Sequence, residues 1–150
     1  MTQSNQTPTP FAAEAVRCAC FNLRKAARAV TQAYDAALEP SGLRATQFSL
    51  LVAVASLGAP TVGGLAEAMV MDRTTMTRNL RPLERARLIA LTAGEDRRVR
   101  HVALTAEGRR RLDDALPMWR RAQLRLVEGL GPGRWDRLLG DLRAAVNASA

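Results

Sequence analysis

The side chains with the most definite chemistry lie in one short segment, residues 72–81, whose sequence is DRTTMTRNLR. After Asp72 no acidic residue occurs until Glu84, so the arginines stand on an acid-free stretch. An Arg guanidinium can donate to both acceptors of a guanine edge or to a phosphate, and a Thr can bond phosphate or contact a thymine methyl. We therefore expect duplex DNA as the partner, with contacts from Arg73, Thr74, Thr75, Thr77, Arg78 and Arg81.

A second basic cluster lies between two apolar runs, residues 88–91 and 99–104. The short polar loop between these runs contains Gly and Asp, which predicts a β-hairpin. Its tip carries Asp96, Arg97 and Arg98. We expect Arg98 to enter the minor groove, with Asp96 orienting its guanidinium through an ion pair, and Arg97 to meet a phosphate.

The elements that position these side chains follow from the apolar spacing. Met76, Leu80 and Leu83 recur at intervals of four and three, which predicts a helix with its core face opposite the basic side chains. Asp72 is a suitable N-cap for this helix, and Thr61 for a shorter helix that ends at about Met69, so only two residues separate that helix from Asp72. The pattern predicts a helix-turn-helix, whose second helix enters the major groove N-terminus first, followed by a hairpin wing.

Longer helical patterns flank this lobe. Residues 11–38 contain neither Gly nor Pro and predict one long helix, and residues 46–57 predict a buried helix that is apolar nearly all round. Residues 106–129 predict a helix that Pro117 bends or splits. A last helix, with Pro132 in its first turn, has one apolar face consisting of Trp135, Leu138, Leu139, Leu142 and Val146.

These elements predict a mainly α-helical fold with a small β-hairpin wing, that is, a winged helix-turn-helix with long N- and C-terminal dimerisation helices. We expect a disordered tail over residues 1–10 and a single domain over 11–150. Within that domain we expect 11–42 and 106–150 to pack together across a homodimer, and 46–104 to form the DNA-binding lobe.

The charge supports a polyanionic partner. The 150 residues carry a formal net charge of +8, and 21 of the 22 basic residues are Arg, with Lys25 the exception. Such a surplus favours nucleic acid or a membrane surface. A membrane-binding module would concentrate its basic residues along one amphipathic helix, whereas here they gather in the segments 73–81 and 97–100.

Other classes of protein find little support. Two Cys and one His are too few for a structural zinc site, so we expect no metal and no cofactor. His101 has no recognisable catalytic partner, and Gly63-Gly64 lacks the Lys-Ser/Thr of a phosphate loop, so we expect no enzyme. The N-terminus lacks a signal peptide and no apolar run could span a membrane, so we expect a cytoplasmic protein.

At this point the residues resemble a known family. The segments LAEAMVMDRTTMTRNLRPLERARLI (65–89) and GEDRRVRHVALTAEGRRRL (94–112) are similar to the multiple-antibiotic-resistance regulator (MarR) family. The most specific part is the wing signature, DRR-x-R-x-x-x-LT-x-x-G, which runs from Asp96 to Gly108. The resemblance implies a homodimeric regulator on a palindromic operator, usually a repressor released by a small ligand or by oxidation. The alternative is a sequence-tolerant architectural DNA-binding protein.

The chain departs from the family pattern at two places. Members usually have Gly at the turn after the recognition helix, where this chain has Arg87. Many also carry a basic residue on the first wing strand, where this chain has Ala90 and Leu91.

Two signals could release such a regulator. Cys20-Phe21-x-Leu23 resembles the peroxide-sensing members, which implies Cys20 as redox sensor and Tyr34 of the partner subunit as its support; their other supporting tyrosine is replaced by Arg24. Cys20 and Tyr34 lie about 21 Å apart along one helix, so they would meet only across a dimer. Cys18 and Cys20 point apart on a helix and would not pair within the chain. The alternative is that both thiols are small core residues.

The second signal is a small molecule. Family members often bind aromatic carboxylates or phenols between the dimerisation helices and the DNA-binding lobe. Arg24, Arg28, Phe48 and the helix 46–57 could line such an effector pocket, with an Arg for the carboxylate. Either signal would shift the spacing of the two recognition helices away from about 34–36 Å.

Overall fold

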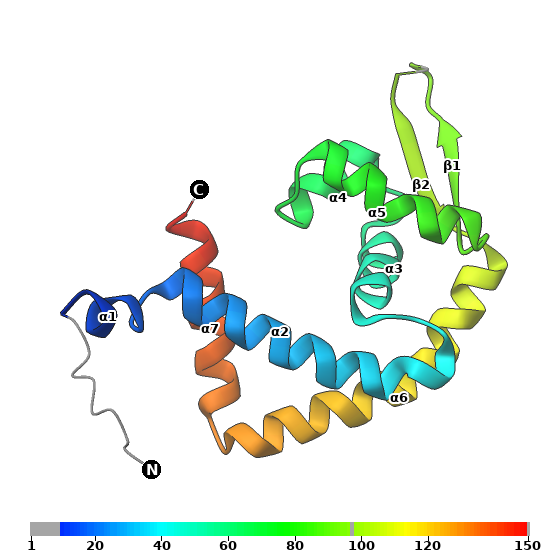
Figure 1. Ribbon diagram of the computed structural model, residues 1–150. Helices are drawn as coiled ribbons and strands as arrows, with labels where there is room; N and C mark the ends of the chain where they lie inside the picture. Colours follow the sequence, from blue (N-terminus) through cyan, green and yellow to red (C-terminus); the bar gives the residue numbers. More distant parts are fainter. Residues whose placement is uncertain (1–9, 97, 150) are drawn as a thin grey trace, which may run out of the picture. The chain divides into compact units, whose positions relative to one another are not determined.

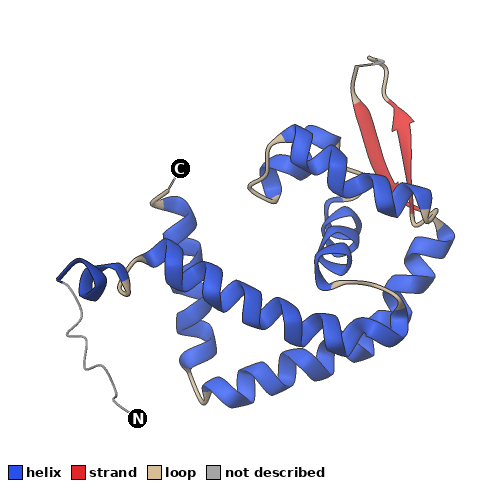
Figure 2. Ribbon diagram, in the orientation of Figure 1, coloured by secondary structure: helices blue, strands red, loops and turns tan. Residues whose placement is uncertain are grey.

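The structure is a computed structural model that describes residues 10–96 and 98–149. It is mostly helical with one hairpin, as expected (Figures 1 and 2). The elements are α1 (Pro10–Ala15), α2 (Ala19–Leu38), a 3-10 turn (Glu39–Ser41), α3 (Ala45–Leu57), α4 (Val62–Ala68), α5 (Arg73–Arg85), β1 (Ile89–Ala93), β2 (Arg100–Leu104), α6 (Ala106–Leu130) and α7 (Arg134–Asn147). Of the expected disordered tail, residues 1–9 lie outside the described residues and Pro10 begins α1.

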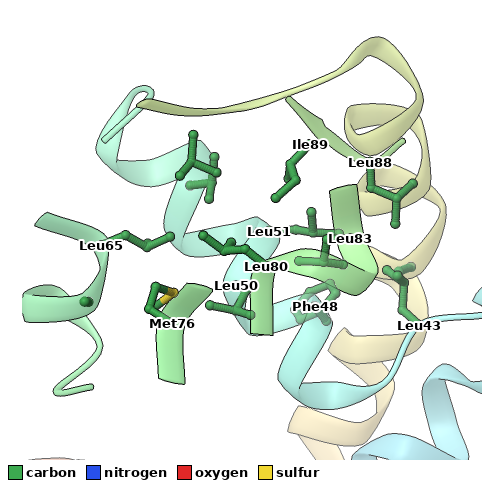
Figure 3. Packing of buried hydrophobic residues seen from close by; sticks show 14 of the residues in the cluster. Leu43, Phe48, Leu50, Leu51, Leu65, Met76, Leu80, Leu83, Leu88 and Ile89 are labelled. Atoms are coloured by element: carbon green, nitrogen blue, oxygen red, sulfur yellow. The ribbon is translucent and has the colours of Figure 1, made fainter. Parts of the chain in front are cut away.

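The contacts within the chain divide it into two compact units, the first extending to Ala33 and the second beginning at Tyr34. The hydrophobic core belongs to the second unit and draws on α3, α4, α5, both strands and α6. Figure 3 shows this packing, in which side chains of α3 and α5 meet. Its largest fully buried side chains are Leu38, Leu51, Val54, Leu65, Met76, Leu80, Leu83 and Val102.

The expected single helix over residues 11–38 is wrong. The chain leaves the helix after Ala15 and resumes it at Ala19. Asn22 stabilises this break, because its side-chain amide donates to the carbonyl oxygens of Val16 and Cys18, at 2.8 and 2.9 Å. A side chain that bonds nearby backbone in this way competes with continuous helix. Cys18 therefore lies in the connection and Cys20 in the first turn of α2, so the two thiols do not share one helix.

The helix α3 begins at Ala45, one residue before the expected start. The carboxylate of Asp35 accepts the backbone N–H of Ala45 at 2.7 Å, which satisfies one of the free donors at this helix end. Its buried side chains include Phe48 and Leu51, but Val52 and Leu57 are 37% and 48% exposed. The expectation that this helix is buried all round therefore holds for one face only.

The hairpin pairs β1 and β2 antiparallel, with Ile89 opposite Leu104 and Leu91 opposite Val102. Ile89 and Val102 are buried, which fixes the face that turns to the core. The middle of β2 is tied to the loop before α4, because the backbone N–H of Val102 donates to the carbonyl of Pro60 at 2.8 Å. The wing thereby has a fixed position relative to the start of α4.

The last two helices differ in detail from expectation. α6 runs without interruption through Pro117, so the proline does not split it, and Figure 1 shows the ribbon curving along its length. α7 begins at Arg134 after Gly133, so Pro132 precedes the helix rather than opening it. Among the residues that the structure describes, no helix combines the length and apolar character needed to cross a membrane.

Candidate nucleic-acid interface

The helix pair α4–α5 has the geometry of a helix-turn-helix. The hydroxyl of Thr61 accepts the N–H of Gly64 at 2.9 Å, and the carboxylate of Asp72 accepts the N–H of Thr75 at 2.8 Å, so both predicted N-caps are confirmed. The turn between the helices contains Val70 with φ +53°, a left-handed conformation that is rare for a β-branched residue. The turn is closed by the N–H of Met71, which donates to the carbonyl of Ala66 at 2.8 Å.

The two faces of α5 are sharply separated. The side chains of Met76, Leu80 and Leu83 are 0–1% exposed and hold the helix on the core. The opposite face, together with the N-terminal end, is open to solvent and holds Arg73, Thr74, Thr77, Arg78 and Arg81. Thr75 is half-buried. The residues of α5 that we predicted to contact DNA, other than Thr75, therefore lie on one exposed surface of this helix.

Two of the three threonines already use their hydroxyl protons within the helix. Thr75 donates to the Asp72 carboxylate at 2.6 Å, and Thr77 donates to the carbonyl of Arg73 at 2.8 Å. A phosphate oxygen can only accept hydrogen bonds, and in this rotamer both hydroxyl protons are already donated. Neither Thr75 nor Thr77 can therefore donate a hydrogen bond to a phosphate in this rotamer. They can still accept from a base amino group or touch a thymine methyl. The same Thr75 hydrogen bonds hold the pKa of Asp72 below its usual range.

At the wing tip the structure revises the expected role of Asp96. Its carboxylate accepts the backbone N–H of Arg98 at 2.9 Å, which shapes the turn, and the expected ion pair with the guanidinium is not formed. Arg98 is exposed, and Arg97 lies outside the described residues. Arg100 is also exposed, and its guanidinium donates to the carbonyl of Leu91 at 3.3 Å.

One relation on this surface has no signal in the sequence. The Arg73 guanidinium lies against Gly63 of α4, so closely that a Cβ at position 63 would be 2.9 Å from its terminal nitrogen. The sequence marks Gly63 only as part of a helix start. The contact depends on the approach of two helices, which no local pattern predicts.

The proposed redox residues are placed separately. Cys18 and Cys20 are both exposed, so neither is a core residue within the chain. Tyr34 is half-buried and its hydroxyl donates to the side-chain oxygen of Gln123 at 2.5 Å, while burial raises its pKa. Cys20 and Tyr34 are 14 positions apart on α2, or about 21 Å, and are not brought together in one chain.

The proposed pocket residues are divided between the two units. Arg24 and Arg28 are exposed on the part of α2 that belongs to the first unit. Phe48 belongs to the second unit, is 4% exposed, and stacks on Trp119 with ring centroids 5.9 Å apart. A cavity of about 540 Å³ lies beside other residues, namely Asp35, Ala36, Glu39, Gly42, Leu43 and Arg44.

The described part of the chain contains no candidate metal site. No group of three or more His, Cys, Asp or Glu side chains lies there in an arrangement that could hold a metal ion. The chemistry available on the exposed face is thus that of guanidinium and hydroxyl groups, which suits a polyanion.

Comparison with known proteins also indicates a DNA-binding protein. A family model described as MarR family matches residues 41–99. The Mycobacterium tuberculosis transcriptional regulator MosR, solved in complex with DNA, is 41% identical with a TM-score of 0.78, over 88% of this chain and 98% of that one. BpsR of Bordetella bronchiseptica, described for the regulation of its DNA binding by 6-hydroxynicotinic acid, is 25% identical with a TM-score of 0.76, over 86% and 93%.

A curated relative extends these matches. YwoH of Bacillus subtilis, an uncharacterized HTH-type transcriptional regulator, is 27% identical over 92 residues, which are 61% of this chain and 67% of that protein. The family and fold are those of regulators and not of enzymes. The chain belongs to the MarR family of winged helix-turn-helix, DNA-binding transcriptional regulators.

Proposed function

We propose that the chain is a homodimeric, sequence-specific repressor, which leaves a palindromic operator when a small ligand binds or a cysteine is oxidised. The observation that carries this proposal is the exposed face of α5, where Arg78 and its neighbours project from a helix that Met76, Leu80 and Leu83 anchor. An anchored helix with bidentate donors can tell base pairs apart, which a merely basic surface cannot.

The dimer is supported by apolar side chains that the single chain leaves uncovered. In the first unit Phe11, Phe21 and Leu23 are 79%, 51% and 42% exposed. In the second unit Leu124 on α6 and Val146 on α7 are 56% and 50% exposed. Exposed apolar surface of this kind marks an interface, and a two-fold dimer presents two recognition helices to a palindrome.

Oxidation is supported by the position of Cys20. Its thiol is exposed in the first turn of α2, so an oxidant has access to it. A ligand is supported by Arg24 and Arg28, whose exposed guanidinium groups can pair with a carboxylate, and by the relative BpsR, whose DNA binding responds to an aromatic acid. In this proposal Phe48 lines the ligand site and makes no polar contact with the ligand.

Specificity is the first test. The affinity for DNA upstream of the protein's own gene is compared with that for an unrelated duplex at one salt concentration. A regulator should prefer its site by about 4–10 kcal/mol, and Arg78→Ala should weaken that preference. Equal affinity for both duplexes would identify an architectural DNA-binding protein instead.

The releasing signal is tested on the same complex. Reduced wild type, wild type treated with an organic hydroperoxide, and the treated variants Cys20→Ser and Cys18→Ser are compared by gel shift. Release of wild type and Cys18→Ser but not of Cys20→Ser assigns the sensor to Cys20. Binding that survives oxidation in all of them rejects the thiol switch and directs the search to aromatic acids.

A further inference from the structure

The loop between α3 and α4, residues 58–61, has an unusual backbone conformation. Ala59 has a φ of +60°, in the left-handed region that residues with a Cβ rarely adopt. Ala59 also precedes Pro60, and a residue before proline favours extended backbone. Such strain persists only where surrounding contacts impose it, and it is concentrated at functional sites. A functional reason for this conformation should therefore lie in the contacts that hold the loop.

Two consecutive residues of the wing hold this loop. The backbone N–H of Val102 donates to the Pro60 carbonyl at 2.8 Å, and the imidazole Nδ1 of His101 lies 3.2 Å from the Ala59 carbonyl oxygen. A carbonyl oxygen can only accept, so Nδ1 carries the proton in this bond. Thr61 and His101 are also partners in an isolated β-bridge. Among the described residues of the wing, only His101 bonds the loop through its side chain.

The other edge of the imidazole lies against Gly94, directly after β1. A Cβ at position 94 would be 3.2 Å from the His101 Nε2 and 3.4 Å from its Cδ2. Gly94 has no left-handed φ, so its backbone conformation does not require glycine. The missing side chain instead leaves room for the ring, which is confined between the Ala59 carbonyl and Gly94.

The wing needs such contacts to keep its orientation. Its two strands have five residues each, and an isolated two-stranded hairpin is only marginally stable in water. Arg98 at the tip is three residues from His101, or up to about 10 Å along an extended chain. A small rotation where the wing meets the loop therefore displaces the tip that is expected to reach DNA.

We propose that His101 is a positioning residue for DNA binding, whose hydrogen bond to Ala59 holds the wing at the angle to the helix-turn-helix that a DNA site requires. The inference rests on the proposed DNA-binding function and deepens it. A wing without this bond adopts the required angle only part of the time, and the apparent affinity falls by that fraction. A neutral hydrogen bond shifts such an equilibrium about 5-fold, so a dimer with two wings should lose about 5–25-fold in affinity.

The test compares DNA affinity among variants of His101. His101→Leu removes the donor, whereas His101→Asn keeps a side-chain N–H as many bonds from Cα as Nδ1. Thr92→Val, on the strand facing His101, is the control for a change that leaves the bond intact. Dissociation constants for the duplex upstream of the protein's own gene and for an unrelated duplex are measured by fluorescence anisotropy. The measurements are made at about pH 8 and about pH 6, a range in which histidine changes its charge.

We expect His101→Leu to bind both duplexes about 5–25-fold more weakly than wild type, although circular dichroism shows it folded. His101→Asn should recover most of this loss at both pH values, and Thr92→Val should bind like wild type. Unchanged affinity of His101→Leu would overturn the inference and show that the bond serves stability alone. Failure of His101→Asn to restore binding would also overturn it. A wild-type affinity that rises toward pH 6 would then assign the only histidine of the chain to direct contact with DNA.

Gly94→Ala tests the space around the ring. The added methyl should displace the imidazole and weaken binding about 2–5-fold, but it should have little effect in His101→Asn, which lacks the Nε2 and Cδ2 atoms. Equal losses in both backgrounds would show that Gly94 acts independently of His101. Equal affinity of wild type for the two duplexes would count against the proposed function alone, because the loss in His101→Leu is also measured on the unrelated duplex.

Discussion

Gly108 in the first turn of α6 lies directly against the carbonyl of Leu88 at the start of the wing. A Cβ at position 108 would stand 1.9 Å from the Leu88 oxygen and 2.8 Å from its carbonyl carbon. The approach is held by Thr105, whose backbone N–H donates to the Leu88 carbonyl at 3.1 Å and whose hydroxyl donates to the Arg87 carbonyl at 2.6 Å. The end of the wing and the start of the long helix thus form one joint, which only glycine can close.

Replacing Gly108 by Ala should therefore destabilise the protein. Without a clash, Ala in a helix would raise the free energy of unfolding by about 0.5–1 kcal/mol relative to Gly. Here the added Cβ meets backbone atoms, which cannot rotate away as a side chain can. We expect a net loss of about 2–3 kcal/mol in the free energy of unfolding, as for other overpacked sites. Urea unfolding at fixed protein concentration measures this loss. The matched control is Gly129→Ala, in the same helix with open space around the added methyl. A stable Gly108→Ala variant would show that the joint can open.

Arg87, where the family usually has Gly, adopts the glycine-like conformation with φ +57°. A non-glycine residue in the left-handed region destabilises the folded state by about 1–2 kcal/mol. Glycine avoids this strain, but it loses more conformational entropy on folding, so only part of the strain energy is gained as stability. Arg87→Gly should raise the free energy of unfolding by about 0.5–1 kcal/mol, measured by thermal unfolding. Arg85→Gly, in the last turn of α5, is the control and should lower it by about 1 kcal/mol. Equal losses in both variants would contradict the strain argument.

Phe48 was predicted to line an effector pocket, but its burial against Trp119 indicates a larger part in stability. Phe48→Ala should cost about 3–5 kcal/mol, and Phe48→Leu, which keeps much of the volume but not the stacking, about 1 kcal/mol. Denaturant unfolding followed by tryptophan fluorescence measures both changes. A loss below about 1 kcal/mol for Phe48→Ala would indicate that the ring faces open space and would favour the pocket role.

Much of the DNA-binding lobe was predictable because its signals are local. The spacing of Met76, Leu80 and Leu83 defined the buried face of α5, and the side chains of Thr61 and Asp72 marked the helix starts. The alternation across residues 88–91 and 99–104 defined the hairpin. Each of these features depends on backbone periodicity or on a hydrogen bond within four residues.

The remaining features depend on contacts between distant segments or on single side-chain rotamers. Asn22 breaks the first helix through bonds to two carbonyls, although the apolar and basic pattern around it is continuous. Gly63 and Gly108 are explained only by what lies against them, Arg73 in one case and Leu88 in the other. The left-handed conformation of Val70 could not be predicted either, because a valine favours extended backbone over a left-handed turn.

Asp72 should make the stability of the lobe depend on acid pH. The Thr75 hydroxyl and backbone N–H donate to its carboxylate and hold its pKa below the usual range of an Asp in the folded state. Its stabilising contribution is therefore complete above about pH 5 and is lost as the pH falls through the folded pKa. Asp72→Asn keeps the cap without the titration, so its unfolding temperature should fall less steeply between about pH 4 and 2. Asp72→Ala lacks both the N-cap hydrogen bond and the titrating carboxylate, so it should unfold at a lower temperature than wild type over the pH range in which the wild-type carboxylate is charged. Parallel curves for wild type and Asp72→Asn would contradict this role.

Tyr34 offers a way to separate a structural from a sensing role. Its hydroxyl proton is committed to Gln123 in the same chain, so we expect Tyr34→Phe to cost about 0.5–1.5 kcal/mol of stability. Because burial raises its pKa, the Tyr34 contribution is present below about pH 10 and is lost as the pH rises further, and this alkaline loss should be absent in the Phe variant. If the role is structural, hydroperoxide should still release Tyr34→Phe from DNA at the wild-type rate. A variant that folds stably but no longer responds to the oxidant would instead assign Tyr34 to the partner's Cys20 thiol.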